Sequence, residues 1–206
     1  RYVKVDGKPY LFIFDPVNLP QEYVDCFKKM SVEAGFPGIY LVANVGDNSI
    51  KKEVMLAKGY DAVCYCDILG HAKQDRNTFW HKVYKHLQGM VLRRPTRVYD
   101  YRKQCKELVG KIDKDDDVIP QIVPQWDHSP RAGRKTIIYT HATPDYFAKH
   151  VRMAMEAIKG KKEEHQILML KSWNEWAEGN YMEPDMTHGR GYIDALREVV
   201  DEYKDK

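Results

Sequence analysis

Two glutamates, Glu175 and Glu178, lie in a six-residue segment, 173–178 (WNEWAE), that also holds two tryptophans and an asparagine. The segment directly follows an apolar stretch of strand length, 166–170. Sugars present apolar C–H faces and rings of hydroxyl groups, so a site for them needs flat aromatic surfaces and planar hydrogen-bonding groups. Two nearby carboxyl groups add the acid and the base that glycoside cleavage requires. The segment therefore predicts a carbohydrate site.

The spacing of the two glutamates supports this prediction only in its context. If the chain turns helically here, both side chains share one face, with Cβ atoms roughly 5–6 Å apart. Two carboxyl groups held so close divide the work, because one of them keeps its proton more readily and can act as an acid. An isolated E-x-x-E pair more often lies on a solvated helix face, and tryptophans after a strand often only cover the core. The dense cluster after a buried strand favours a site.

A second polar segment, 125–131 (QWDHSPR), follows an expected strand at 118–123. In parallel sheets, sites lie at the carboxyl ends of the strands, so this segment is expected near the first one. Asp127 and Arg131 would either hold a ligand or form a simple ion pair with each other. Other polar residues that follow expected strands are Asp15, Asn44, Asp47, Asn48 and Asp67.

Composition argues against several other classes of protein. The net charge of +3, from 33 basic and 30 acidic residues, gives no electrostatic case for nucleic acid or an anionic membrane. No apolar run approaches the roughly 20 residues of a membrane span. No glycine-rich phosphate loop follows a strand, and the D-x-D sequence in 113–117 precedes one and reads as a solvated turn. The histidines are scattered, and so are Cys26, Cys64, Cys66 and Cys105, so neither a metal site nor a cofactor is expected.

Strand and helix patterns alternate along one domain, 1–206, as five βα units. The first helix is expected to carry Tyr23, Phe27 and Met30 on one face. No two-residue hairpin turn is apparent between strands, so the fold class is α/β with a parallel sheet, either doubly wound or part of a barrel. Expected strands are 9–14, 38–43, 61–65, 118–123 and 166–170, and expected helices are 20–35, 50–57, 77–87, 99–109, 143–158 and 192–203.

Five segments together resemble one known family. They are 1–9 (RYVKVDGKP), 59–62 (GYDA), 126–131 (WDHSPR), 143–147 (TPDYF) and 172–184 (SWNEWAEGNYMEP). In this order they resemble the WbsX-like family of bacterial polysaccharide-biosynthesis clusters, which is similar to the glycoside hydrolase family of endo-α-mannosidases. The last segment is long and specific. The chain departs from the usual family pattern at His128-Ser129, where asparagine and threonine are common, and at Asp15, where arginine is.

The resemblance implies a (β/α)8 TIM-like barrel, of which about the last five βα units are present. It implies a retaining endo-glycosidase acting on α-linked, mannose-like glycans through a 1,2-anhydro sugar. Glu175 would be the base that deprotonates the sugar 2-hydroxyl, and Glu178 the acid that protonates the leaving oxygen and later activates water. The implied substrate-binding residues are Trp126, Asp127, Arg131, Trp173, Asn174 and Trp176.

For any function of this chain, the expected compartment is the cytoplasm or the cell envelope of a bacterium. Two functions other than hydrolysis are compatible with the sequence. One is a glycosyltransferase of O-antigen or capsular polysaccharide assembly. The other is a non-catalytic glycan-binding module.

Whatever the function, the five expected strands would leave 9–14 as an open edge of the sheet, and 166–170 would lack a closing partner. We therefore expect about three further strands from an N-terminal part of the same protein.

Overall fold

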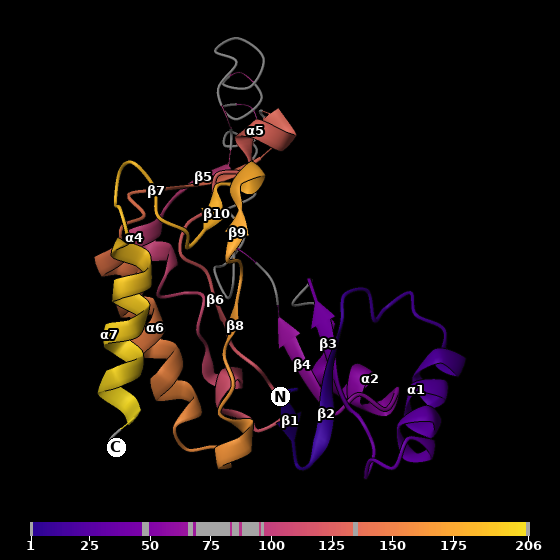
Figure 1. The fold of residues 1–206 in the computed structure, drawn as a ribbon. Coiled ribbons are helices and arrows are strands. Elements are labelled where there is room, and N and C mark those ends of the chain that lie inside the picture. Colours follow the sequence, from indigo (N-terminus) through magenta and orange to yellow (C-terminus); the bar gives the residue numbers. More distant parts are fainter. Residues whose placement is uncertain are drawn as a thin grey trace. The chain divides into compact units, whose positions relative to one another are not determined.

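The computed structural model describes residues 2–46, 50–65, 97–133 and 136–204, together with Ile68, Val83, Leu87 and Pro95. The chain forms two compact units (Figure 1). The first comprises Arg1–Gly70, Gly110–Gln121 and Glu156–Met169, and the second comprises His71–Val109, Ile122–Met155 and Leu170–Lys206. The expected helix 77–87 and the residues Asp47, Asn48, Cys66 and Asp67 fall outside the described residues, apart from Val83 and Leu87.

The first unit is built on a four-stranded sheet in the order β1-β2-β3-β4. The strands are β1 (Lys4–Val5), β2 (Lys8–Ile13), β3 (Tyr40–Val45) and β4 (Ala62–Tyr65). β2, β3 and β4 are parallel, as expected. Leu41 and Val42 bury opposite faces of β3 completely, which matches the two-residue period of a strand covered on both sides.

The β1–β2 pair corrects the sequence prediction. These strands are antiparallel and are joined by a two-residue turn, Asp6-Gly7, with positive φ angles of 50° and 73°. Such angles suit the tight hairpin turns that match the twist of the strands they join. The edge at 9–14 is therefore partly covered, because Lys4 pairs with Pro9 and Val5 with Lys8.

Two helices cover one face of this sheet, α1 (Gln21–Glu33) and α2 (Lys52–Ala57). The face of α1 that carries Tyr23, Phe27 and Met30 is not its buried face, because Tyr23 and Met30 are 56% and 57% exposed. The buried positions are Val24 and Ser31, with Phe27 packed beside them. The spacing 24, 27, 31 is as helical as 23, 27, 30, so periodicity alone does not choose between the two faces.

The other face of the sheet carries a second apolar cluster. Tyr40 and Val42 from β3 meet Val5 from the hairpin and Ile119 from a later segment. That segment continues the sheet, since Val118 forms a parallel bridge with Val63 of β4. Next to it, the Met169 N–H donates to the Pro120 carbonyl. The charged turn before this segment is only partly solvated, because Asp113 is 4% exposed and accepts the Gly110 N–H.

The second unit holds the parallel pair β5 (Arg97–Asp100) and β7 (Ile137–Thr140). Neither strand was expected, and 99–109 was expected to be a helix. The helix α4 (Tyr101–Gln104) begins later because the Asp100 side chain accepts the Arg102 N–H and ends the strand there.

Two long helices of the sequence prediction are confirmed, α6 (Pro144–Ile158) and α7 (Gly191–Lys204). Arg152 of α6 pairs with Glu198 and Glu202 of α7, at 2.9 and 2.6 Å.

The remaining elements are β6 (Gln121–Ile122), β8 (Met169–Leu170), β9 (Asn174–Glu175), β10 (Asn180–Tyr181), α5 (Ser129–Ala132) and the 3-10 turns η1 (Lys111–Lys114), η3 (Glu163–His165) and η4 (Trp176–Glu178). Of the helices in the described part of the chain, none combines the length and apolar character that crossing a membrane requires.

Candidate active site

The two glutamates lie on a short hairpin in the second unit. β9 pairs antiparallel with β10, so that Glu175 lies opposite Asn180. Glu175 ends β9 and precedes the 3-10 turn η4, which Glu178 ends. The expected helical turn is thus a 3-10 turn that begins just after Glu175. The prediction that the two side chains share a side is confirmed in this form, because both carboxyl groups lie within 4.0 Å of one guanidinium group.

Gly179 allows the hairpin to pack closely against the second polar segment, 125–131. Gly179 has a positive φ of 53° and turns the chain from η4 into β10. A Cβ atom at this position would lie 2.9 Å from the N, Cβ and O atoms of Asp127. This close approach lets the Asp127 N–H donate to the Glu178 carbonyl at 3.0 Å. The two segments therefore meet through their backbones, as their position after neighbouring strands predicts.

Two residues that sequence reasoning did not single out hold Glu175 in place. The Ser172 hydroxyl donates to the Asn180 carbonyl at 2.8 Å and accepts the Glu175 N–H at 3.2 Å. The Asn180 side chain is fully buried, and its amide donates to the Gln125 carbonyl at 2.6 Å. Their only sequence signal was membership of the 172–184 segment. Both act as bridges between stretches of backbone.

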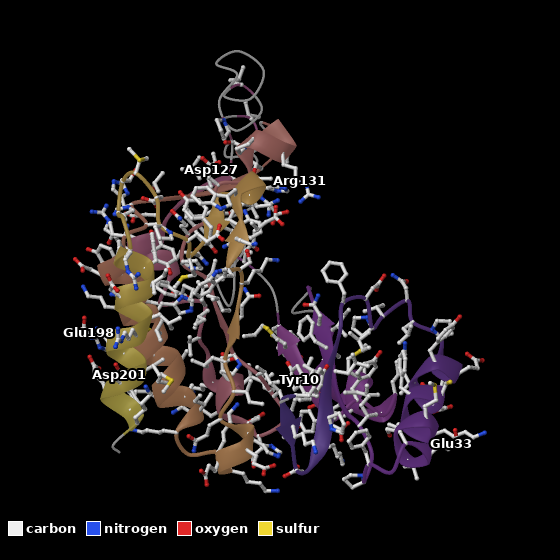
Figure 2. All side chains as sticks on the ribbon, viewed as in Figure 1. Tyr10, Glu33, Asp127, Arg131, Glu198 and Asp201 are labelled. Carbon is white, nitrogen blue, oxygen red and sulfur yellow. The ribbon has the colours of Figure 1, made fainter. Side chains whose placement is uncertain are left out.

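Arg131 joins the two carboxylates. Its Nη1 atom lies 2.9 Å from Oε1 of Glu178 and 4.0 Å from Oε1 of Glu175. The Glu178 side chain is 18% exposed and the Glu175 side chain 44%, so Glu178 is the more shielded of the two. The expected alternative, a simple Asp127–Arg131 ion pair, is wrong. The Asp127 carboxylate instead accepts the Ser129 N–H at 2.9 Å. Ser129 is the first residue of α5, the helix that carries Arg131 (Figure 2).

The tryptophans differ in accessibility. Trp173 and Trp176 are each about half exposed, at 49% and 48%. Trp176 stacks on Tyr181, with ring centroids 3.8 Å apart, and its indole N–H donates to Glu183. Trp126, in contrast, is 5% exposed, so its ring offers no open surface for stacking. Asn174 is exposed and lies opposite Tyr181 in the hairpin.

Chemically, the site offers two carboxyl groups in unlike surroundings, a cation that contacts both, and two half-exposed indole rings, of which that of Trp176 has one face on Tyr181. Among the described residues, no group of three or more His, Cys, Asp or Glu side chains is arranged to hold a metal ion. Carboxyl groups with unequal exposure and partners suit separate acid and base roles. Open aromatic rings beside them suit the apolar faces of sugars. The fold and the site together define an α/β protein with a candidate carbohydrate site.

The chain belongs to the family described as Glycosyltransferase WbsX, whose model matches residues 1–196. Among curated proteins it is similar to the proteins named WxcX in two strains of Xanthomonas campestris pv. campestris. It is 32% identical to each over 107 residues, which is 50% of this chain and 15% of theirs. The chain therefore spans a small part of the length of these relatives.

Solved structures share the fold. One is the GH99 endo-alpha-mannosidase of Bacteroides thetaiotaomicron in complex with bis-tris-propane, with a TM-score of 0.60 and 15% identity over 98% of this chain and 59% of that one. Another is described as a glycoside hydrolase-like protein, with a TM-score of 0.56 and 16% identity over 96% of this chain and 55% of that one. The chain has an α/β fold that matches part of the GH99 structures, as the sequence predicts.

Proposed function

We propose that this chain supplies the catalytic part of a retaining endo-glycosidase that acts on α-linked, mannose-like glycans. The carrying observation is that Glu175 and Glu178 lie within reach of one guanidinium group, that of Arg131, at the tip of a hairpin with two half-exposed tryptophans. The likeness of the fold to a GH99 endo-alpha-mannosidase supports the proposal. In the whole protein, a (β/α)8 barrel would complete the substrate cleft.

The proposed reaction gives each glutamate one role. Glu175, the more open carboxylate, removes the proton from the 2-hydroxyl of the sugar, whose oxygen attacks the anomeric carbon. Glu178 protonates the departing glycosidic oxygen, and a 1,2-anhydro sugar results. Glu178 then takes a proton from water as the water oxygen opens this ring, and Glu175 returns a proton to the 2-oxygen. The two displacements retain the anomeric configuration, and the proton balance closes on the two carboxyl groups.

The remaining residues would bind the glycan. Trp173 and Trp176 have the exposure that stacking on a sugar ring needs. Asn174 is open to hydroxyl groups on the same hairpin. Arg131 has further N–H donors beyond the one directed at Glu178, and these suit sugar hydroxyls. Asp127 accepts the Ser129 N–H and Trp126 is buried, which supports an indirect role of both residues in shaping the loop.

A glycosyltransferase of polysaccharide assembly is the second candidate, and the description of the family favours it. Such an enzyme would use the same acid and base pair on an activated sugar donor. A non-catalytic glycan-binding module is the third possibility, because a platform of tryptophans and hydroxyl-binding groups binds sugars without any turnover.

The test uses the full-length protein and a panel of α-linked manno-oligosaccharides. New reducing ends should appear, and proton NMR during the first turnovers should show the α-anomer as initial product. Glu175→Gln and Glu178→Gln should each lower kcat by orders of magnitude while the glycan still binds. Glu163→Gln, an exposed change on η3 in the other unit, is the matched control and should be silent. Sugar transfer without hydrolysis would instead support a transferase, and binding without turnover a binding module.

A further inference from the structure

Glu178 has two basic neighbours on the same carboxylate oxygen. Arg131 Nη1 lies 2.9 Å from Oε1, and His128 Nε2 lies 3.4 Å from it. The guanidinium N–H of Arg131 donates to this oxygen. The proposed reaction, however, needs a proton at Glu178 when the glycosidic bond breaks. The arrangement therefore requires a nearby place where that proton can reside.

His128 has the position for this task. Its Nε2 atom is buried and has no well-formed hydrogen bond among the described residues, and the nearby acceptor is Oε1 of Glu178. The ring is held edge-on against Trp126, with centroids 5.9 Å apart and planes at 67°. The His128 N–H donates to the Ile137 carbonyl of β7, which fixes its backbone. The imidazole is thus held near Glu178 by its contact with Trp126 and by the backbone hydrogen bond to Ile137.

Three other charged side chains lie near His128 and Glu178, those of Arg131, Lys171 and Asp127. Arg131 contributes a fixed positive charge that contacts both glutamates. Lys171 lies over the ring of Trp126, with Nζ 5.1 Å from its centroid, on the aromatic residue that also contacts His128. The Asp127 carboxylate is directed to the Ser129 N–H. An imidazole nitrogen can both donate and accept a proton, which makes His128 the natural proton carrier among these groups.

We propose that His128 is a positioning residue that stores the proton delivered by Glu178. This inference rests on the proposed glycosidase function. In the resting site, Nε2 of His128 carries the proton and Glu178 is ionised. As the glycosidic bond breaks, the N–H bond breaks, the proton passes through the Glu178 carboxyl group, and an O–H bond forms on the leaving oxygen. When water attacks the anhydro sugar, its proton returns through Glu178 to Nε2, so each cycle ends as it began.

The test is the pH dependence of kcat/KM for the full-length protein on the manno-oligosaccharide that it cleaves. The wild-type rate should fall on the basic side of the profile. In His128→Asn and His128→Gln, this fall on the basic side should disappear, and the maximal rate should drop by about tenfold to a hundredfold. In His128→Ala, added imidazole should restore part of the rate, which a merely structural role would not allow. His141→Asn, an exposed histidine of the same unit, is the control and should keep the wild-type profile.

The possible results distinguish a failure of the His128 proposal from a failure of the glycosidase proposal. An active wild type whose pH profile is unchanged in both amide variants, with no rescue by imidazole, overturns the role of His128 alone. A wild type that cleaves nothing overturns both proposals. If His128→Ala does not fold, as judged by circular dichroism, the two amide variants decide the question.

Discussion

Arg131 and Glu178, 47 positions apart in the sequence, are joined by a hydrogen-bonded ion pair of 2.9 Å between Nη1 and Oε1. The contact links the α5 loop to the hairpin that carries both glutamates. The Arg131 side chain is 60% exposed, and ion pairs in such surroundings stabilise a fold by only about 0–1 kcal/mol. The contribution of the Arg131–Glu178 ion pair to stability can therefore be measured separately from its contribution to the site.

Arg131→Ala should leave the free energy of unfolding within about 1 kcal/mol of the wild type while it lowers kcat/KM at least tenfold. Urea denaturation and steady-state kinetics on the full-length protein measure the two effects. Arg197→Ala removes a comparable exposed ion pair, with Asp201 on α7, and should change neither quantity much. A large loss of stability with unchanged kinetics would show that Arg131 serves the fold and not the site.

Gly179→Ala should be clearly more damaging than Gly189→Ala. Both glycines have a similar positive φ, 53° and 55°, so both substitutions carry the conformational cost of about 1–2 kcal/mol. Only at Gly179 does the new Cβ meet another backbone, that of Asp127 at 2.9 Å, whereas nothing lies within 4 Å at Gly189. The difference between the two unfolding free energies measures the contact. Equal losses would mean that Asp127 does not approach Gly179 this closely.

The hairpin of the first unit should depend on pH through Asp6. The Asp6 carboxylate accepts a hydrogen bond from His165 Nε2 at 2.9 Å, and this bond, together with the charge of His165, lowers the pKa of Asp6. A lowered carboxyl pKa contributes stability above the ordinary value of about 4, and that stability is lost as pH falls through the folded value. Urea midpoints between pH 6 and pH 2 should therefore fall less steeply in Asp6→Asn than in the wild type. Parallel curves for the two proteins would contradict this account.

Tyr101→Phe tests a buried hydrogen bond to the backbone just before the 125–131 segment of the site. Tyr101 is completely buried, and its hydroxyl donates to the Val123 carbonyl, just before the 125–131 segment. Leaving that buried carbonyl without its donor should cost about 1–3 kcal/mol of unfolding free energy. Tyr23→Phe, on the exposed face of α1, is the control and should be nearly neutral. Equal stabilities of all three proteins would show that the buried hydrogen bond contributes little.

The elements that could be predicted from sequence are those with strong local signals. The helix α6 begins at Thr143-Pro144, a hydroxyl residue followed by a proline at the first helical position, and its bounds are confirmed. The strands β5 and β7 were missed because each is stabilised by pairing with the other, about 40 residues away in sequence. Hairpin β1–β2 was missed although Asp6-Gly7 is a typical turn pair.

By itself, the sequence determined the family, the parallel α/β character of the first unit and the clustering of Glu175 and Glu178, because these depend on residue order and short-range periodicity. Only the tertiary structure decided that Arg131 pairs with Glu178 and not with Asp127, that Trp126 is buried while Trp173 is open, and that His128 faces a carboxylate. Such partnerships join side chains dozens of positions apart. Local propensity carries no information about them, because they are set by which backbones approach closely enough, as they do where Gly179 meets Asp127.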